Sequence, residues 1–209
     1  MPRKNVIKTY APDSFYHVYN RGVDKMVIFK TKTDYLYFTS LLLYYLCPDD
    51  NLAVASLPTR RGIRQESSNL SSDVALVSYC LMPNHFHLLI KQKSAESMTR
   101  LMKRVSNSYA SYFNLRYSRT GHLFESNSKA VLIETDEQLI HTSRYIHLNP
   151  LTLGVNPLKY QFSNFSSIVY DIPTPFTKTD LLLEYFDASS QKYHDFVSAR
   201  EVPLRIMSG

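Results

Sequence analysis

Two histidines stand one residue apart in an apolar stretch, in the segment LMPNHFHLLIK at residues 81–91. In an extended strand, residues two apart point to the same face, so the imidazoles of His85 and His87 share one side of the strand. Two imidazoles directed into the same space are either a pair of metal ligands or a chance feature of a half-polar strand. A third ligand and a reactive group are needed to decide between these interpretations.

The segment RYIHLNP, residues 144–150, offers both groups. Tyr145 and Asn149 are four residues apart, which places them on the same face of a helix. If this helix packs beside the histidine strand, two imidazoles and an amide oxygen would bind a divalent ion, and this mixed set suits Mn²⁺ better than Mg²⁺. The ion would polarise a phosphodiester, and the tyrosine would attack it to form a phosphotyrosine link. His141 is a candidate for tuning the tyrosine proton, whereas His147 lies about 200° around the helix.

Each of these residues also has a structural interpretation. A His-x-His pair on a strand is more often incidental than metal-binding, and one of 16 tyrosines normally belongs to a core or an interface. Asn149 precedes Pro150, which is typical of a residue that ends a helix. Hydrolases of nucleotides with alternating histidines need a third alternating histidine, and here Leu89 stands at that position.

Composition narrows the classes of protein. A length of 209 residues is enough for one domain with a full core, and no apolar run approaches the length of a membrane helix. The N-terminus lacks the apolar region of a signal peptide, and the two cysteines suggest neither a disulfide framework nor a cysteine metal site. We therefore expect a cytoplasmic protein with no membrane partner. The net charge of +6 favours a polyanionic partner, most often nucleic acid.

Periodicity predicts strands separated by helices. The strands are expected at 14–22, 74–82, 83–91 and 122–134, and the helices at 33–46, 94–118 and 135–150. Thr33 is the expected N-cap of the first helix, and Thr135 with Gln138 matches a capping box at the start of the last. This order is typical of a ferredoxin-like βαββαβ sandwich, an α+β fold with an antiparallel sheet and helices on one face.

The chain is expected to have a catalytic domain at 1–155 and a C-terminal extension at 156–209. Residues 47–73 show no periodicity and are rich in Ser, Asn, Asp, Pro and Gly, so they are expected to be a loop insertion. The extension should pack on the core or trail from it. It is expected to have little regular structure apart from a short amphipathic stretch at 179–186.

Four blocks, in order along the chain, resemble the REP-associated tyrosine transposases, which belong to the wider IS200-like group of single-strand HUH transposases. The blocks are YHVYNRG (16–22), SYCLMPNHFHLLI (78–90), NLRYSRTGHLF (114–124) and RYIHLNPLTLGV (144–155). A later segment, YQFSNFSSIVY (160–170), resembles the part of these proteins that follows the core.

The resemblance implies a metal-dependent enzyme that nicks single-stranded DNA and transfers the strand through a 5′-phosphotyrosine intermediate. His85 and His87 would hold Mg²⁺ or Mn²⁺, with Asn149 as a further ligand where some relatives have glutamine, and Tyr145 would be the nucleophile. The implied partner is single-stranded DNA with palindromic-repeat hairpins. Relatives act as dimers or alone, so a homodimer stays open.

Five basic residues are expected to hold the DNA backbone. They are Arg21, Lys103, Arg104, Arg116 and Arg119. Two alternatives to the strand-transfer enzyme stay open: a transposase-derived regulator that binds DNA hairpins without cutting them, and a metal-dependent hydrolase of small nucleotides.

Overall fold

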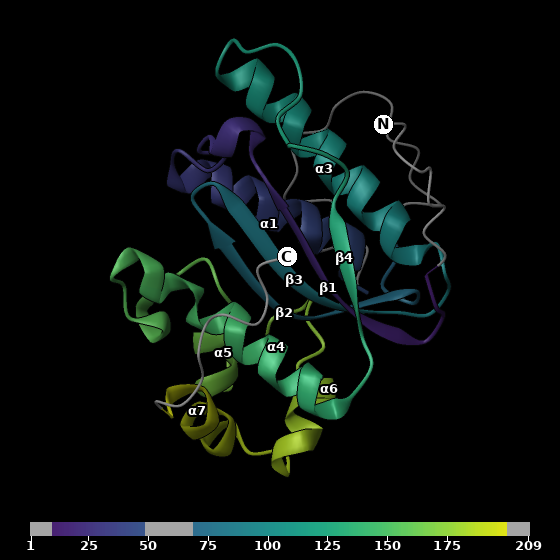
Figure 1. The fold of residues 1–209 in the computed structure, drawn as a ribbon, viewed down its shortest axis with the longest axis vertical. Coiled ribbons are helices and arrows are strands. Elements are labelled where there is room, and N and C mark those ends of the chain that lie inside the picture. The colour runs from purple at the N-terminus through teal and green to yellow at the C-terminus, as the bar shows by residue number, and fades with distance from the viewer. Residues whose placement is uncertain (1–9, 49–68, 200–209) are drawn as a thin grey trace, which may run out of the picture.

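The computed structural model of the chain describes residues 10–48 and 69–199, shown in Figure 1. Within these residues an antiparallel sheet has the strand order β2-β3-β1-β4. The strands are β1 (Ser14–Arg21), β2 (Val74–Met82), β3 (His85–Gln92) and β4 (Lys129–Ile133). The α-helices are α1 (Lys32–Leu46), α3 (Ser97–Arg116), α4 (Asp136–Leu148), α5 (Phe165–Val169), α6 (Asp180–Leu183) and α7 (Ser190–Ser198). Most of the expected insertion at 47–73 lies outside the described residues.

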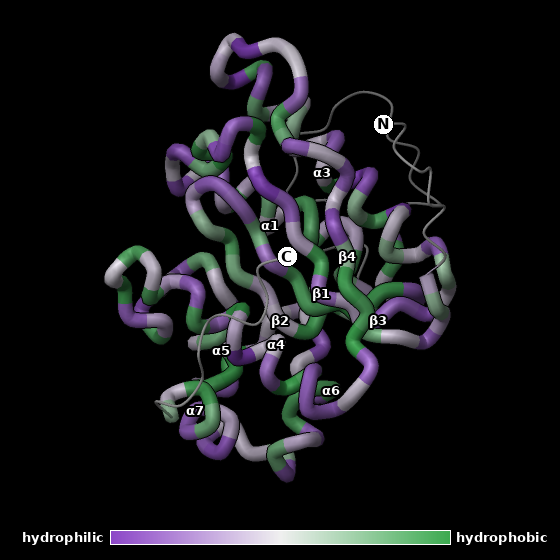
Figure 2. Tube along the Cα trace, viewed as in Figure 1, coloured by the Kyte–Doolittle hydropathy of each residue, from purple (hydrophilic) through white to green (hydrophobic). Residues whose placement is uncertain are grey.

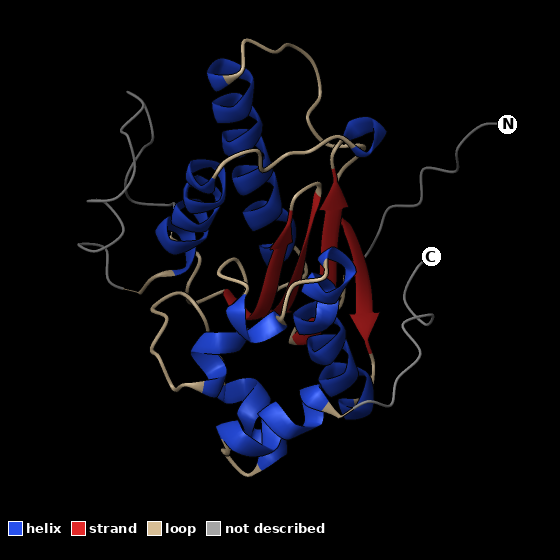
Figure 3. Cartoon of the chain, turned by 90° about the vertical axis from the view of Figure 1, so that its left-hand side faces the viewer, coloured by secondary structure: helices blue, strands red, loops and turns tan. Residues whose placement is uncertain are grey.

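Helices α1 and α3 cover one face of the sheet, and Figure 3 shows the strands between this pair and a second group of helices. The even-numbered residues of β1 and β3, such as Val18 and Leu88, point into this first layer. They are buried there with the apolar sides of the two helices, including Phe38 and Tyr109. The α+β fold predicted from the sequence, a ferredoxin-like βαββαβ sandwich with its two helices on one face, is confirmed.

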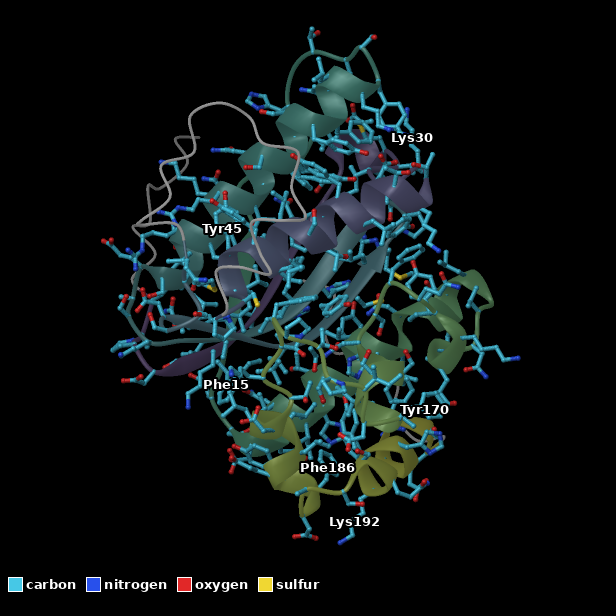
Figure 4. The ribbon with its side chains drawn as sticks, turned by 180° about the vertical axis from the view of Figure 1, so that it is seen from behind. Phe15, Lys30, Tyr45, Tyr170, Phe186 and Lys192 are labelled. Carbon is cyan, nitrogen blue, oxygen red and sulfur yellow. The ribbon has the colours of Figure 1, made fainter. Side chains whose placement is uncertain are left out.

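The opposite face of the sheet is covered by α4 and the C-terminal helices. Leu89 of β3 and Leu139 and Ile146 of α4 are buried in this second core. Figure 4, seen from behind, shows Phe186 within this layer and Tyr45 in the layer of α1 and α3. In Figure 2 the hydrophobic residues follow the strands at the centre, because the strands are covered on both faces.

The sequence between strands and helices accounts for where the helices begin. Helix α1 starts at Lys32, and its N-cap is Thr31, two residues before the expected Thr33. The Asp34 carboxylate accepts a hydrogen bond from the backbone N–H of Thr31 at 2.8 Å, as in a capping box. At α4, Thr135 accepts from the N–H of Gln138 at 3.1 Å, so that predicted cap is confirmed.

The segment after α4 has more regular structure than its prolines indicated. A 3₁₀ turn at Asn149–Leu153 leads to α5, α6 and α7, which pack against α4 and β2. Buried His147 of α4 contacts the Tyr193 hydroxyl at 2.7 Å and Asn164 Oδ1 at 3.0 Å. Asn164 also donates to the carbonyl of Val77 in β2, so it joins α4 to the sheet. Within residues 10–48 and 69–199, no helix is both long and apolar enough to cross a membrane.

Candidate active site

The two histidines singled out in the sequence lie at the start of β3, on the face that α4 covers. In the antiparallel pairing of β1 with β3, Tyr19 stands opposite His87 and Arg21 opposite His85. The rings of His85 and His87 are 4.9 Å apart between centroids. The prediction that alternation would bring both imidazoles to one face is therefore confirmed by the register.

His87 is buried against a third histidine. Its Nδ1 lies 2.9 Å from Nε2 of His17 on β1, and the two side chains are 6% and 2% exposed. His17 stands opposite Leu89 in the register, so it is the diagonal neighbour of His87 on the same face. The contact occupies Nδ1 of His87, which makes Nε2 the ring nitrogen available to other groups.

His85 is held by the residue before it. Its Nδ1 lies 2.6 Å from Oδ1 of Asn84, while the Asn84 amide nitrogen donates to the carbonyl of Lys25 at 3.2 Å. A carboxamide oxygen only accepts hydrogen bonds, so Nδ1 of His85 is the donor and its Nε2 keeps a lone pair. The turn between β2 and β3, which contains Asn84, is held to the chain after β1, because the N–H of Gly22 donates to the carbonyl of Asn84 at 2.9 Å.

Helix α4 brings the predicted tyrosine and asparagine to the histidines. The ring of half-buried Tyr145 is 5.3 Å from that of His87 and 5.9 Å from that of His17, edge-on to both. Asn149 is 7% exposed, and its amide nitrogen donates to the carbonyl of Tyr145 at 2.8 Å. The Asn149 side chain also interacts with the side chains of His85 and Tyr145.

The histidines are neutral at ordinary pH because the site is buried. Burial lowers the pKa of His17 to about 4. Burial, with a smaller effect from the charge of Arg21, lowers the pKa of His85 to about 4. The pKa of His87 is also well below its usual value, first because of burial and then because of the neighbouring histidines. Neutral imidazoles are the form that binds metal ions.

The donors of this site fit a divalent cation. The Asn149 amide nitrogen is used by helix carbonyls, so its oxygen is the atom free to face His85, whose Nε2 also carries a lone pair. An imidazole nitrogen and an amide oxygen that both carry free lone pairs are suitable ligands for such a cation. Among the described residues no three His, Cys, Asp or Glu side chains gather as a metal-binding group, and the Asn149 amide is a ligand of another type beside the two imidazoles.

Of the basic residues predicted to contact DNA, only Arg21 lies beside the histidines. Exposed Lys103 and half-buried Arg104 are on α3, across the sheet. Arg116 is 3.5 Å from the carboxylate of Asp34, and Arg119 donates to loop carbonyls, including that of His122 at 2.6 Å. The structure does not bring these four to the histidines, and their contact with DNA stays a prediction.

The two histidines of α4, His141 and His147, do not face the candidate site in the same way as Tyr145. His141 packs its ring against Phe196 of α7 at 5.4 Å, and its role in tuning the tyrosine proton stays a prediction. His147 faces the second core, as its helical position predicted. Sequence reasoning gave no role to His17 or Asn84. For His17, the alternation of the 14–22 strand was the available signal.

Comparisons with known proteins agree with this architecture. Residues 63–149 match the family model described as "Transposase IS200 like". The structure of a REP-associated tyrosine transposase bound to a REP hairpin superposes with a TM-score of 0.53 at 12% sequence identity, over 84% of this chain and 91% of that chain. A tRNA(His) guanylyltransferase from Saccharomyces cerevisiae aligns with a TM-score of 0.30 at 11% identity, over 87% of this chain and 81% of that one, and this is too low to carry an argument.

No curated protein gives a significant match to the chain. At 12% identity, the likeness to the transposase structure shows a shared fold, whereas the family model matches the sequence of the segment that ends at Asn149. That segment contains both histidines, Tyr145 and the sequence of β2, β3, α3, β4 and α4. The recognition made from the sequence blocks is therefore confirmed: residues 63–149 match the IS200-like transposase family model, and the chain has the fold of a REP-associated tyrosine transposase.

Proposed function

We propose that this protein is a metal-dependent enzyme that nicks single-stranded DNA near hairpins and transfers the cut strand through a 5′-phosphotyrosine intermediate. The observation that carries the proposal is the convergence of four side chains, two from β3 and two from α4 and its C-cap. The ring of Tyr145 lies 5.3 Å from that of His87, and the Asn149 side chain interacts with both Tyr145 and His85. A nucleophile and a set of cation ligands thus share one site.

His85, His87 and Asn149 would hold the cation, Mg²⁺ or Mn²⁺. The chemistry of the donors supports this assignment, because both imidazoles are neutral and have Nδ1 occupied, and the Asn149 amide nitrogen is used by a helix carbonyl while its oxygen keeps its lone pairs. When bound, such a cation supplies Lewis-acid stabilisation of charge on the scissile phosphate. Nitrogen ligands favour Mn²⁺ over Mg²⁺.

Tyr145 has to lose its proton to attack phosphorus. Burial raises the pKa of its phenol, while the neighbouring Asn149 side chain and the positive charge of Arg21 act in the opposite direction with smaller effect. Attack by the phenolate forms a bond from phosphorus to the tyrosine oxygen and breaks the bond to the 3′ oxygen. The products are a free 3′-hydroxyl and a 5′ end held on the protein, and a 3′-hydroxyl can rejoin that end in the reverse reaction.

The DNA backbone would approach along β1, where exposed Arg21 lies opposite His85 and the Lys129 ammonium lies 5.8 Å from the ring of Tyr19. Two cations and an aromatic ring beside the nucleophile suit a single strand, which offers phosphates and unpaired bases. The solved transposase of the same fold was bound to a REP hairpin, and we extend that class of substrate to this chain.

The proposal is tested with a pool of single-stranded hairpins that have randomised flanks and a fluorophore at the 3′ end. With Mn²⁺, we expect a fluorescent protein band on a denaturing gel, because the labelled fragment stays on tyrosine. Tyr145→Phe should remove this band while hairpin binding persists. Tyr170→Phe is the matched control and should keep the band, because it removes the hydroxyl of an exposed tyrosine at the end of α5 that has no part in the proposed site.

Two outcomes would count against the proposal. An undiminished adduct in Tyr145→Phe would show that another residue is the nucleophile. Tight hairpin binding by the wild-type protein with no adduct in either Mn²⁺ or Mg²⁺ would favour the regulator that binds without cutting.

A further inference from the structure

His17 is a buried polar residue for which the proposed chemistry has no use so far. Its side chain is 2% exposed and lies within the sheet face that carries the candidate site. Its ring is 5.1 Å from that of Tyr19 and 5.9 Å from that of Tyr145, and its Nε2 contacts Nδ1 of His87 at 2.9 Å. Buried His17 thus has His87, a candidate metal ligand, as its polar partner.

The contact between the two rings contains one hydrogen atom, so one ring donates and the other accepts. If His87 donates from Nδ1, its Nε2 keeps a lone pair. If His17 donates, the hydrogen of neutral His87 is on Nε2, which then cannot bind a cation. At His85 the question is already settled, because Asn84 Oδ1 accepts from Nδ1. His85 and His87 both carry their hydrogen on Nδ1 and a lone pair on Nε2 only when His17 is the acceptor.

We infer that His17 is a positioning residue that accepts the Nδ1 hydrogen of His87 and so keeps the Nε2 of His87 ready for a divalent cation. This inference rests on the proposed function, because it concerns the readiness of a ligand. When the group that accepts a hydrogen bond from the second nitrogen of a metal-bound histidine is removed, metal affinity falls by about 10- to 100-fold.

The test uses two amide variants of His17. In His17→Gln the amide group ends close to where Nε2 of the histidine lies, so it can still accept from His87. In His17→Asn the amide group ends one bond earlier and falls short of His87. Both variants are polar, uncharged and smaller than histidine, so a general loss of packing affects both.

Two measurements are made on each protein. Long-range ¹H–¹⁵N NMR of the metal-free protein reports which nitrogen of His87 carries the hydrogen, and the electron paramagnetic resonance signal of free Mn²⁺ gives the dissociation constant. We expect the hydrogen on Nδ1 of His87 in the wild type. In His17→Asn, part of it should move to Nε2, and the dissociation constant should rise about 10- to 100-fold. His17→Gln should retain most of the wild-type affinity.

The inference is overturned if wild-type His87 carries its hydrogen on Nε2, or if the two variants have the same affinity for Mn²⁺. Should His17→Asn fail to fold, the tautomer of wild-type His87 decides alone. His87→Ala separates this result from a failure of the proposed function. If that variant binds Mn²⁺ as tightly as the wild type, the cation site is wrong, whatever the role of His17.

Discussion

Asp34 is expected to be one of the strongest single determinants of stability in the first layer. Its side chain is fully buried at the start of α1. Oδ2 accepts from the N–H groups of Thr31 and Lys30 at 2.8 and 2.9 Å and from the hydroxyl of Tyr117 at 2.7 Å, and Oδ1 accepts from the hydroxyl of Tyr112 at 2.9 Å. The carboxylate thus joins the cap of α1 to the C-terminal end of α3.

The change Asp34→Ala removes all of these acceptors. Loss of the cap costs about 1 kcal/mol. A hydrogen bond to a charged group contributes about 1.5–3 kcal/mol, but the contributions are not additive, and the two half-buried tyrosines regain some contact with water. Arg116 also loses its partner at 3.5 Å. We therefore expect the free energy of unfolding to fall by about 3–5 kcal/mol, as for removal of one partner from a buried charged network.

Urea unfolding followed by circular dichroism measures this loss, with Asp73→Ala as the matched control. Asp73 pairs with Arg100 at 3.1 Å, but both side chains are substantially exposed, so its loss should cost under about 1 kcal/mol. Equal losses in the two variants would refute the reasoning. Although burial raises the pKa of Asp34, the hydrogen bonds outweigh it and the pKa is lowered. Its contribution is therefore present above about pH 4 and lost as the pH falls through the lower native value.

Three further predictions concern a turn, a buried histidine and the DNA contact. Gly22→Ala would place a Cβ against the carbonyl oxygen of Met26. The free energy of unfolding should therefore fall by about 1–3 kcal/mol, measured by thermal unfolding, and an unchanged midpoint temperature would contradict this clash. Burial lowers the pKa of His147 to about 4, so the unfolded state binds more protons between pH 6.5 and 4. Wild-type stability should fall on acidification through that window by on the order of 3 kcal/mol from this residue, and urea titrations of His147→Gln should show a smaller fall. Arg21→Gln should reduce the salt dependence of hairpin binding by about one phosphate contact in fluorescence anisotropy, whereas Lys192→Gln, on exposed α7, should not; equal effects would mean that the DNA does not follow β1.

Local patterns were enough to predict most of the sheet and the pair of histidines. Strict alternation defines which residues of a strand share a face, so the common side of His85 and His87 followed from spacing alone. The cap at Thr135 followed from side-chain chemistry within four residues. The placement of Tyr145 on that side followed from helical spacing plus the assumption, now confirmed, that α4 packs beside β3.

What the sequence could not predict depends on contacts between distant segments. His17 meets His87 only because β1 pairs with β3 in a particular register, which alternation does not specify. Helical periodicity shows that Lys103 faces outward, but not which face of the sheet α3 covers. Helices α5 and α6 have five and four residues, too few for a periodic signal, and they are stable only because they pack on α4 and β2.

The packing of α4 between the sheet and the C-terminal helices has a consequence for protein engineering. A minimal version of this protein, shortened at the boundary near residue 155, would retain every side chain of the candidate site. It would nevertheless remove Tyr193 and Asn164, the partners of buried His147, and open the core that Leu139 and Ile146 share with the C-terminal helices. A smaller scaffold therefore needs a redesigned polar surface on the side of α4 that carries His147, or Tyr145 will lose its alignment with the histidines.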